Sequence, residues 1–254
     1  MLEEVARIAG EAGRIAAGRY GTAFGRWEKK PGEIVCEIDL EVDAFLRERL
    51  GSLDPEAGWL SEETLDASDR YERRRTWVVD PIDGTRDYVR GRPGWSVSVA
   101  LVEDRAPVIG VLSAPLRGEL WTATRGGGAF RNGERLRASG RTELPGARVP
   151  AEQLPAADAD LAMVAKPNSI ALRIALVAAG EADLVATLKW GFEWDIAAAA
   201  LIAEEAGARV TGALGQPLTF NTASGAAFGV LAAAPGIHAA AVERLRERAL
   251  EVVG

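Results

Sequence analysis

The sequence predicts an α/β protein with an α+β N-terminal lobe, and three observations lead to this class. Apolar side chains recur at helical spacing in residues 2–20 and again after residue 39. Between residues 77 and 123 the pattern changes to the alternation of strands. Beyond residue 160, short apolar runs and helical patterns follow one another, as they do in layered α/β structures.

The chain is expected to begin with two helices. Residues 2–20 are rich in Ala, Glu and Arg, and Gly21 is placed to end the first helix. The second helix is expected to follow Asp39, a good N-cap residue, and to close at Gly51. Cys36, the only cysteine, precedes this helix in an acidic stretch that disfavours a thiolate, so we interpret it as a small packed residue.

Strands are expected next. Residues 77–79 form an apolar run, and residues 95–101 alternate apolar with small side chains. An antiparallel meander is completed by strands at 108–112 and 119–123 and by a hairpin turn at 131–134. The glycine triplet at 126–128 is interpreted as a turn rather than a phosphate-binding loop, because no helix follows it.

The second half is expected to alternate helices and strands. Residues 140–160 are rich in Pro, Ala and Asp without periodicity, so we place a boundary there between lobes 1–140 and 141–254. The elements expected beyond it are a strand at 161–165, a helix at 169–179, a strand at 182–186, a helix at 195–206, a strand at 226–232 and a helix at 236–253.

Composition limits the classes of function. The chain of 254 residues has 48% hydrophobic and 26% charged residues, which is ordinary for a globular protein. No apolar run reaches the roughly 20 residues of a membrane span, the acidic N-terminus is unlike an export signal, and a single cysteine fits a cytoplasmic location. The net charge of −7 disfavours binding to nucleic acid. We therefore expect the partner to be a small molecule. We expect the protein itself to be a monomer or a homodimer.

Histidine is too scarce for several common mechanisms. His238 is the only histidine, and it lies near the C-terminus. A zinc site of several histidines or a Ser-His-Asp triad needs a histidine beside the reacting group. We therefore interpret His238 as a polar residue at the start of the last helix.

Residues 80–85, Asp-Pro-Ile-Asp-Gly-Thr, carry the strongest chemical signal. They follow the apolar run 77–79, which places Asp80 at the end of a strand, where ligands bind in α/β sheets. Two carboxylates that face one side repel each other unless a cation lies between them, and ligands made only of oxygen suit Mg²⁺. The N–H groups of Gly84 and Thr85 could hold a phosphate oxygen. We favour this site over a plain Asp-Gly turn.

Three motifs resemble those of the inositol monophosphatase superfamily. Residues 77–90 resemble its first signature, residues 194–207 resemble its second, and Leu60-Ser61-Glu62-Glu63 resembles the acidic motif before the first. Their order along the chain also matches. The resemblance implies the sugar-phosphatase fold, an αβαβα layered sandwich, and a phosphomonoesterase with two or three Mg²⁺ ions per site. It also implies inhibition by lithium.

The resemblance assigns roles residue by residue. Glu62 corresponds to a metal-binding glutamate that positions the attacking water, and Asp39 to an aspartate that pairs with Thr85 in catalysis. The metal ligands it implies are Glu62, Asp80, the Ile82 carbonyl, Asp83 and Asp195, and the groups that meet the substrate are Asp83, Gly84, Thr85 and Asp195. Read alone, Asp195 is equally well a helix N-cap, and the role of Glu63 stays open. The first lobe is expected to carry the metal-binding motif, and the second to complete the site and hold the substrate alcohol.

The choice of substrate depends on residues 186–192, shortly before the second signature. Inositol monophosphatases have an acid there that holds inositol hydroxyls, whereas this chain has Lys189 and Trp190. A base and a ring suit a second phosphate and a nucleobase, although a solvent-facing lysine on a loop explains Lys189 equally well. We predict that Lys189 binds the substrate.

Further stretches, at 27–32, 35–37, 60–63 and 110–115, are similar to bacterial 3′(2′),5′-bisphosphate nucleotidases. This similarity implies hydrolysis of 3′-phosphoadenosine 5′-phosphate to AMP and phosphate, a reaction of sulfur assimilation, by a metal-activated water. The alternative substrate is inositol 1-phosphate or a related sugar phosphate. An alternative of another class is a non-catalytic binding or regulatory protein on the same fold, against which the complete set of acidic residues argues.

Overall fold

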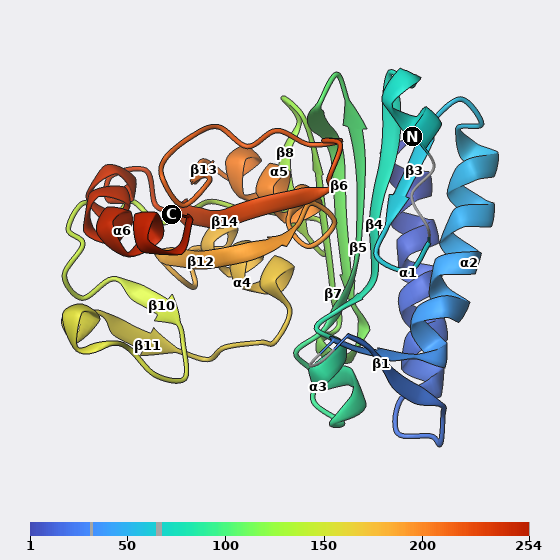
Figure 1. The fold of residues 1–254 in the computed structure, drawn as a ribbon, viewed down its shortest axis with the longest axis horizontal. Coiled ribbons are helices and arrows are strands. Elements are labelled where there is room, and N and C mark those ends of the chain that lie inside the picture. The colour runs from blue at the N-terminus through green and yellow to red at the C-terminus, as the bar shows by residue number, and fades with distance from the viewer. Residues whose placement is uncertain (31–32, 65–67, 254) are drawn as a thin grey trace.

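The computed structural model describes residues 1–30, 33–64 and 68–253. These residues form successive layers of helix, sheet, helix, sheet and helix (Figure 1). Helices α1 (Leu2–Arg19) and α2 (Glu37–Leu53) cover one face of a large sheet, and α4 (Ile170–Ala178) and α5 (Ala197–Glu205) separate its other face from a smaller sheet. Helix α6 (His238–Val253) covers the outer face of the small sheet. The predicted αβαβα sandwich is confirmed.

The large sheet has the strand order β3-β4-β5-β6-β7-β8-β9. Its strands are β3 (Gly58–Ser61), β4 (Arg75–Asp83), β5 (Ser96–Glu103), β6 (Ala106–Ala114), β7 (Glu119–Thr124), β8 (Gly128–Arg131) and β9 (Glu134–Arg135). Among the described strands of this sheet only β3 and β4 pair in parallel, and the antiparallel pairs from β4 to β9 confirm the predicted meander. The hairpin turn at 131–134 has Asn132 and Gly133 at positive φ, as a two-residue hairpin loop requires.

The glycine triplet forms the turn between β7 and β8, as predicted. The N–H groups of Gly126 and Gly128 donate to the carboxylate of Glu205 at 2.7 and 2.8 Å. Because Glu205 is the last residue of α5, these bonds tie the turn to the helix layer.

The second half contains more strand than the sequence indicated. The small sheet has the order β12 (Leu184–Phe192), β14 (Ala226–Ala233), β13 (Arg209–Thr211), with both pairs antiparallel. Strand β12 continues to Phe192 rather than ending at residue 186, so Lys189 and Trp190 are strand residues. Strands β10 (Arg148–Pro150) and β11 (Ala162–Val164) form a short parallel pair, and β10 lies in the segment without periodicity where we placed the boundary between the lobes. The division of the chain near residue 140 stays a prediction.

The start of α2 differs from the prediction. The helix begins at Glu37, directly after the hairpin of β1 (Arg26–Lys30) and β2 (Glu33–Cys36), and its N-cap is Cys36. Asp39 is the third residue of the helix, and its carboxylate accepts a hydrogen bond from the Cys36 N–H at 2.8 Å. The expected N-cap at Asp39 is therefore wrong, because the carboxylate caps backwards from inside the first turn. Residues 31 and 32, the end of the stretch at 27–32, lie outside the described residues.

The remaining short elements are η1 (Ser68–Glu72), α3 (Thr85–Val89), η2 (Pro115–Arg117) and η3 (Ala156–Asp158). The lone histidine opens α6, as predicted, and its buried ring lies 3.0 Å from the Thr211 hydroxyl. Cys36 is fully buried, which confirms its interpretation as a packed residue. Within the described ranges, no helix combines the length and apolarity needed to cross a membrane.

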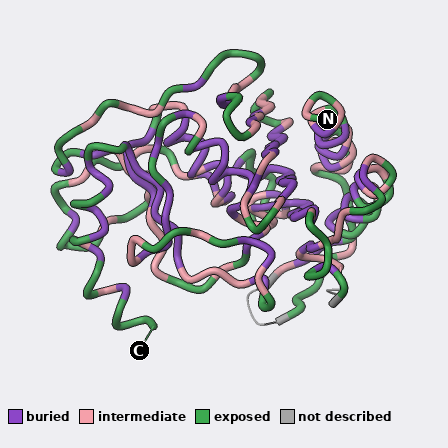
Figure 2. Tube along the Cα trace, turned by 90° about the horizontal axis from the view of Figure 1, so that it is seen from above, coloured by how far each residue is buried: buried purple, intermediate pink, exposed green. Residues whose placement is uncertain are grey.

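The core is continuous through the helix layer between the two sheets. Buried residues run through the interior of the molecule, whereas its periphery, including the end of α6, is exposed (Figure 2). Helix α5 begins with four consecutive buried alanines, Ala197 to Ala200, which let it approach the large sheet closely. A Cβ at Gly110 of β6 would lie only 2.6 Å from the carbonyl oxygen of Ala198. The close approach of β6 and α5 therefore requires glycine at position 110.

Candidate active site

An extra residue in β4 brings Asp80 and Asp83 to one face of the large sheet. Asp80 lies opposite Ser98 and Asp83 opposite Ser96, so β4 advances three residues while β5 advances two. In a regular strand, residues three apart point to opposite faces, and a bulge of one residue reverses this. Ile82 accordingly packs in the core beneath α1 and α2, while Asp83 faces α4.

Asp83 is held by the start of α4. Ser169, the N-cap residue of this helix, donates its hydroxyl to Asp83. The N–H groups of Ile170 and Ala171 donate to the same carboxylate at 3.3 and 2.8 Å. Burial nevertheless raises the pKa of Asp83, against the lowering by these donors. Ser169 was predicted only as the start of a helix, and the contact that gives it a place in the site joins segments far apart in the sequence.

Asp195 lies in the turn between β12 and α5. Its Oδ2 accepts a hydrogen bond from the N–H of Phe192 at 3.1 Å. Helix α5 begins at Ala197 with Ile196 as its N-cap residue. The reading of Asp195 as a helix N-cap is therefore wrong, because its carboxylate turns back towards the end of β12.

The three aspartates converge. One carboxylate oxygen from each of Asp80, Asp83 and Asp195 lies within 4.8 Å of the other two. Burial raises the pKa of Asp195 to about 7, and the charge of Asp83 adds to this. Burial also raises the pKa of Asp80 well above its usual range, with Glu62 adding to the effect. The cluster thus holds excess negative charge where water screens it poorly, and its oxygen donors fit a hard divalent cation such as Mg²⁺.

Glu62 adjoins this cluster. It follows β3, and its N–H donates to the carbonyl of Val79 at 3.4 Å, beside β4. Burial raises the pKa of Glu62, and the charges of Asp195 and then Glu63 add to this. Glu62 is therefore within electrostatic reach of the cluster, although it is not one of the three residues whose oxygens lie within 4.8 Å.

Glu63 faces a different partner. Its buried carboxylate forms an ion pair with Lys29 of β1, and the same ammonium group donates to the Glu62 carbonyl at 3.2 Å. Lys29 thereby holds the backbone of this acidic motif from the β1–β2 hairpin. Glu63 is therefore placed to hold Lys29 against the backbone of Glu62.

Thr85 and Asp39 lie together, but the hydroxyl has a closer partner. Thr85 Oγ1 donates to the carbonyl of Ile82 at 2.9 Å and lies 3.5 Å from Asp39 Oδ1. A hydroxyl has a single proton, so the shorter contact takes it. Burial raises the pKa of Asp39 to about 6, opposed by the hydrogen bonds from Cys36.

A cavity of about 430 Å³ lies over these residues and contains charges of both signs. Its lining includes the predicted residues Glu62, Asp83, Gly84, Thr85, Lys189 and Asp195 and also the bases Arg86, Lys166 and Arg173. Arg173 was not predicted. Its guanidinium donates to the carbonyls of Pro167 and Asn168 at 3.0 and 2.5 Å, and within the described part of the chain it forms no ion pair. Its place on the pocket side of α4 becomes visible only in the folded chain.

The aromatic side chains at the end of β12 give the same cavity an apolar surface. Trp190 and Phe192 line it, and Trp190 is 59% exposed. The Trp190 ring meets Phe228 edge to face, with centroids 5.4 Å apart. A large exposed ring supported by a second ring provides a surface on which a planar ligand can stack.

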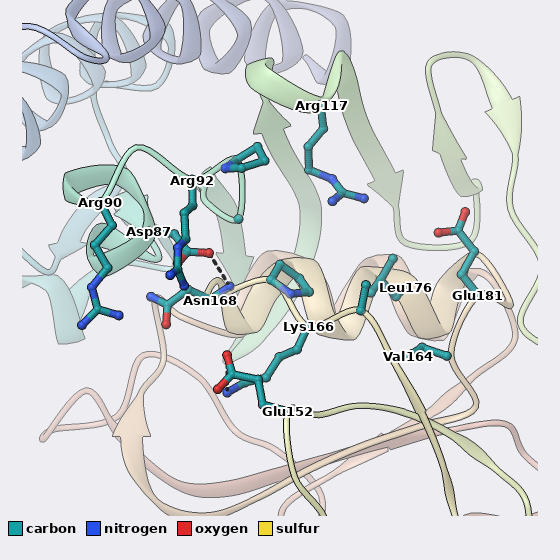
Figure 3. A pocket seen from close by; sticks show the side chains of 14 residues that line it. Asp87, Arg90, Arg92, Arg117, Glu152, Val164, Lys166, Asn168, Leu176 and Glu181 are labelled. Carbon is teal, nitrogen blue, oxygen red and sulfur yellow. Dashed lines mark hydrogen bonds and ion pairs between the residues drawn. The ribbon is translucent and has the colours of Figure 1, made fainter.

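A second cavity, of about 420 Å³, shares Lys166 and Asn168 with the first (Figure 3). Its acids each have a partner: Asp87 accepts from the Asn168 N–H, Glu152 lies 3.9 Å from Lys166, and Glu181 pairs with Arg131. The cavity therefore lacks, among the described residues, the convergent carboxylates that a divalent cation needs. The candidate site is the first cavity.

Residues 1–251 match the model of the inositol monophosphatase family. The chain belongs to this family. Inositol monophosphatase 2 of Solanum lycopersicum is 33% identical over 231 residues, which cover 82% of this chain and 87% of that protein. The 3′(2′),5′-bisphosphate nucleotidase CysQ of Aggregatibacter actinomycetemcomitans is 32% identical over 235 residues, 87% of each chain. The solved structure of an IMPase from Thermotoga maritima, 29% identical, superimposes with a TM-score of 0.84 over 100% of this chain and 99% of that one.

Membership of the inositol monophosphatase family makes this chain a phosphatase, a hydrolase of phosphoric monoesters. The predicted resemblance and the prediction of an enzyme are thereby confirmed. Two relatives whose names give different substrates are almost equally similar to it. The choice of substrate therefore has to be argued from the pocket.

Proposed function

We propose that this protein is a Mg²⁺-dependent phosphomonoesterase that removes the 3′-phosphate of 3′-phosphoadenosine 5′-phosphate and releases AMP. The observation that carries the proposal is a cavity lined both by carboxylates of the acidic cluster and by basic side chains. The carboxylates suit a metal-assisted reaction at one phosphate, and the bases suit a second phosphate on the same molecule.

Asp80, Asp83 and Asp195 would hold Mg²⁺, together with the Ile82 carbonyl and Glu62. Mg²⁺ bound to such a set lowers the pKa of a water and offsets the charge of the phosphate. The bulge in β4 supports this assignment, because it directs Asp80 and Asp83 to one side. The bonds from the start of α4 fix the Asp83 carboxylate, so that it does not have to be ordered when the substrate arrives.

The residues around the cluster would position the reacting groups. Glu62, which lines the cavity, would accept a hydrogen bond from the attacking water, and Asp39, whose carboxylate lies 3.5 Å from the Thr85 hydroxyl, would support Thr85. The N–H groups of Gly84 and Thr85 would hold a phosphate oxygen. Gly84 has φ +96°, and a Cβ there would lie 2.9 Å from the N–H nitrogen of Ser169, so only glycine allows this approach to α4. These groups position and hydrogen-bond; none forms a covalent intermediate.

The basic side chains support a substrate with two phosphates. Arg173 and Lys189 line the cavity and form no ion pair among the described residues, and Lys166 has only a distant partner, Glu152 at 3.9 Å. A second phosphate on the substrate would give Arg173 and Lys189 an anionic partner, which a neutral polyol lacks. Trp190 offers a face for an adenine ring. The similarity to a bisphosphate nucleotidase agrees with this choice.

Phosphate release from a panel of substrates tests the proposal. The panel contains 3′-phosphoadenosine 5′-phosphate, inositol 1-phosphate and fructose 1,6-bisphosphate, each with Mg²⁺. We expect the highest kcat/KM for the bisphosphorylated nucleotide. A higher kcat/KM for inositol 1-phosphate would overturn the substrate assignment, and full activity with a chelator present would overturn the assigned role of Mg²⁺. The proposal includes inhibition by Li⁺, a cytoplasmic place in sulfur assimilation, and a monomer or homodimer.

A further inference from the structure

Glu193 is a buried acid beside the site for which the proposed reaction has no use. It is 0% exposed and lies two residues before Asp195, at the point where β12 has just ended. Its carboxylate accepts hydrogen bonds from the N–H of Asn221, from the N–H of Thr222 at 2.9 Å and from the Thr222 hydroxyl. Both of its oxygens are therefore occupied by donors from a loop almost thirty residues away.

The backbone of Glu193 is bonded as completely as its side chain. Its N–H donates to the carbonyl of Gly225 at 2.8 Å, and its own carbonyl accepts from Ile196 and Ala197 at 3.2 and 2.9 Å. The N–H of Glu193 thus ties the turn that carries Asp195 to the loop 221–225, and the carbonyl of Glu193 ties it to the start of α5. These bonds fix the backbone from which the Asp195 side chain extends.

A buried arginine completes the network. Arg70 of η1 is 0% exposed, and it donates to the Asn221 side chain and to the Thr222 carbonyl at 2.8 Å. Its guanidinium lies 4.2 Å from the centroid of the Tyr71 ring. The same two loop residues therefore bind Glu193 through their N–H groups and Arg70 through their oxygens. The loop therefore joins η1 to the turn that carries Asp195.

We infer that Glu193 is a positioning residue that sets the direction of the Asp195 carboxylate towards the divalent cation. It does not touch the cation or the substrate; it acts through the turn that it shares with Asp195. The inference rests on the proposed function, because it takes Asp195 as a ligand of the metal. Groups that orient metal ligands are worth about 10–100-fold in metal affinity.

Binding of Mn²⁺ to the full chain, followed by the EPR signal of the free ion, tests this without any turnover. In Glu193→Gln the amide nitrogen would meet an N–H donor, so the turn loses one of its bonds. We expect Mn²⁺ to bind about tenfold more weakly or worse, with a matching rise in the Mg²⁺ concentration that gives half-maximal activity. Thr222→Val, which removes only the hydroxyl donor, should weaken Mn²⁺ binding to a smaller extent. Thr222→Ser, which keeps the hydroxyl, should bind Mn²⁺ with the original affinity.

Asp183→Asn is the matched control. Asp183 is also a buried acid with an arginine partner, and it lies directly before β12 whereas Glu193 lies directly after it. We expect this variant to lower the Tm and to leave Mn²⁺ binding unchanged. If Glu193→Gln has a lower Tm but binds Mn²⁺ with the original affinity, the inference is wrong and the proposed function is unaffected. If Glu193→Gln does not fold, unchanged Mn²⁺ affinity in Thr222→Val has the same meaning. Failure of the unsubstituted chain to bind millimolar Mn²⁺ would overturn the proposed function as well.

Discussion

Asp80 is the residue on which the proposed chemistry depends most directly. It is 1% exposed, one of its carboxylate oxygens lies within 4.8 Å of an oxygen of Asp83 and one of Asp195, and the charge of Glu62 acts on it. Its Oδ1 accepts a hydrogen bond from the N–H of Ile82 at 2.9 Å, which leaves the other oxygen for the cluster. The residue is thus oriented by its own strand, and replacement of one oxygen changes the charge of the cluster with little change in volume.

For Asp80→Asn we expect hydrolysis to fall below about a tenth of the original rate, since even groups that only orient metal ligands contribute about 10–100-fold. The fold should be kept, because the amide has nearly the volume of the acid. Phosphate release and circular dichroism measure the two effects. Retention of more than about a tenth of the activity, in a folded protein, would contradict the role of Asp80 as a ligand.

Arg173 allows a second prediction at the scale of one side chain. Loss of a charge-assisted hydrogen bond costs about 1.5–3 kcal/mol, or about tenfold or more in binding. For Arg173→Gln we therefore expect KM for 3′-phosphoadenosine 5′-phosphate to rise about tenfold, while KM for 3′-AMP, which lacks the second phosphate, stays the same.

The matched control is Arg92→Gln. Arg92 is an exposed arginine that lines the second cavity (Figure 3), and its loss should change neither KM. An equal rise in KM for both substrates in Arg173→Gln would mean that Arg173 supports the pocket as a whole. That result would remove it from the recognition of the second phosphate.

At the scale of elements, the start of β12 is held by an ion pair. The Asp183 carboxylate, 1% exposed, accepts from the Arg148 guanidinium at 2.8 Å, from the Arg148 N–H at 2.9 Å and from the Ser139 hydroxyl at 2.6 Å. Burial alone would raise the pKa of Asp183, but these donors outweigh it and lower the pKa from 3.8 to about 2. Arg148 belongs to β10, so the pair joins the short β10–β11 sheet to β12.

This pair makes stability depend on pH. Because the folded-state pKa is lowered, the ionised pair stabilises the fold above pH about 4 and loses this contribution as the pH falls towards 2. At pH 7 we expect Asp183→Asn to lower the free energy of unfolding by about 2 kcal/mol. Urea titrations at pH 7 and pH 2.5 measure the difference between variant and parent. A difference of the same size at both pH values would contradict the assignment.

The elements also show how far the sequence determines the fold. Strongly periodic segments were predicted well: α1, α6 and strands β5 to β7 match their ranges closely. The short strands β10 and β13 were missed, because three residues contain no period and pair only once the rest has folded. The predicted start of α2 was also wrong. An aspartate can bond to the backbone N–H groups at the start of a helix either as the N-cap residue or as the third residue of the helix, and Asp39 does the second.

At the scale of the whole molecule, the layers depend on the close contact of β6 with α5. Gly110→Ala would place a methyl group 2.6 Å from the Ala198 carbonyl oxygen and force the helix layer away from the sheet. We expect a loss of about 1–3 kcal/mol in the free energy of unfolding, measured in urea.

Gly10 of α1 is the control, because a Cβ there meets nothing within 4 Å. Gly10→Ala should be neutral or should stabilise the protein by about 0.5–1 kcal/mol, through helix propensity. If the two alanine variants have the same free energy of unfolding, β6 and α5 can move apart to accommodate a methyl group at little cost, and the prediction is wrong.

Some residues of the candidate site could be predicted from the sequence, and others could be found only in the folded structure. The acidic residues occur in motifs, so Glu62, Asp80, Asp83 and Asp195 could be named in advance, and the structure brings the three aspartates together. Arg173, Ser169 and Glu193 lie in ordinary helix, cap and turn contexts. The site partners of Ser169 and Glu193 are distant in sequence, and Arg173 reaches the cavity only because α4 packs beside the large sheet, so no local pattern marks these residues.

The inserted residue in β4 has a consequence for how this strand tolerates change. Removing Ile82 would let β4 pair regularly with β5 and would leave Asp80 and Asp83 two residues apart, on the same face of the sheet. The strand would lose the side chain that packs beneath α1 and α2 and the carbonyl that accepts from the Thr85 hydroxyl. The extra residue therefore lets one short segment give two carboxylates to the acidic cluster and an isoleucine to the core on the opposite face.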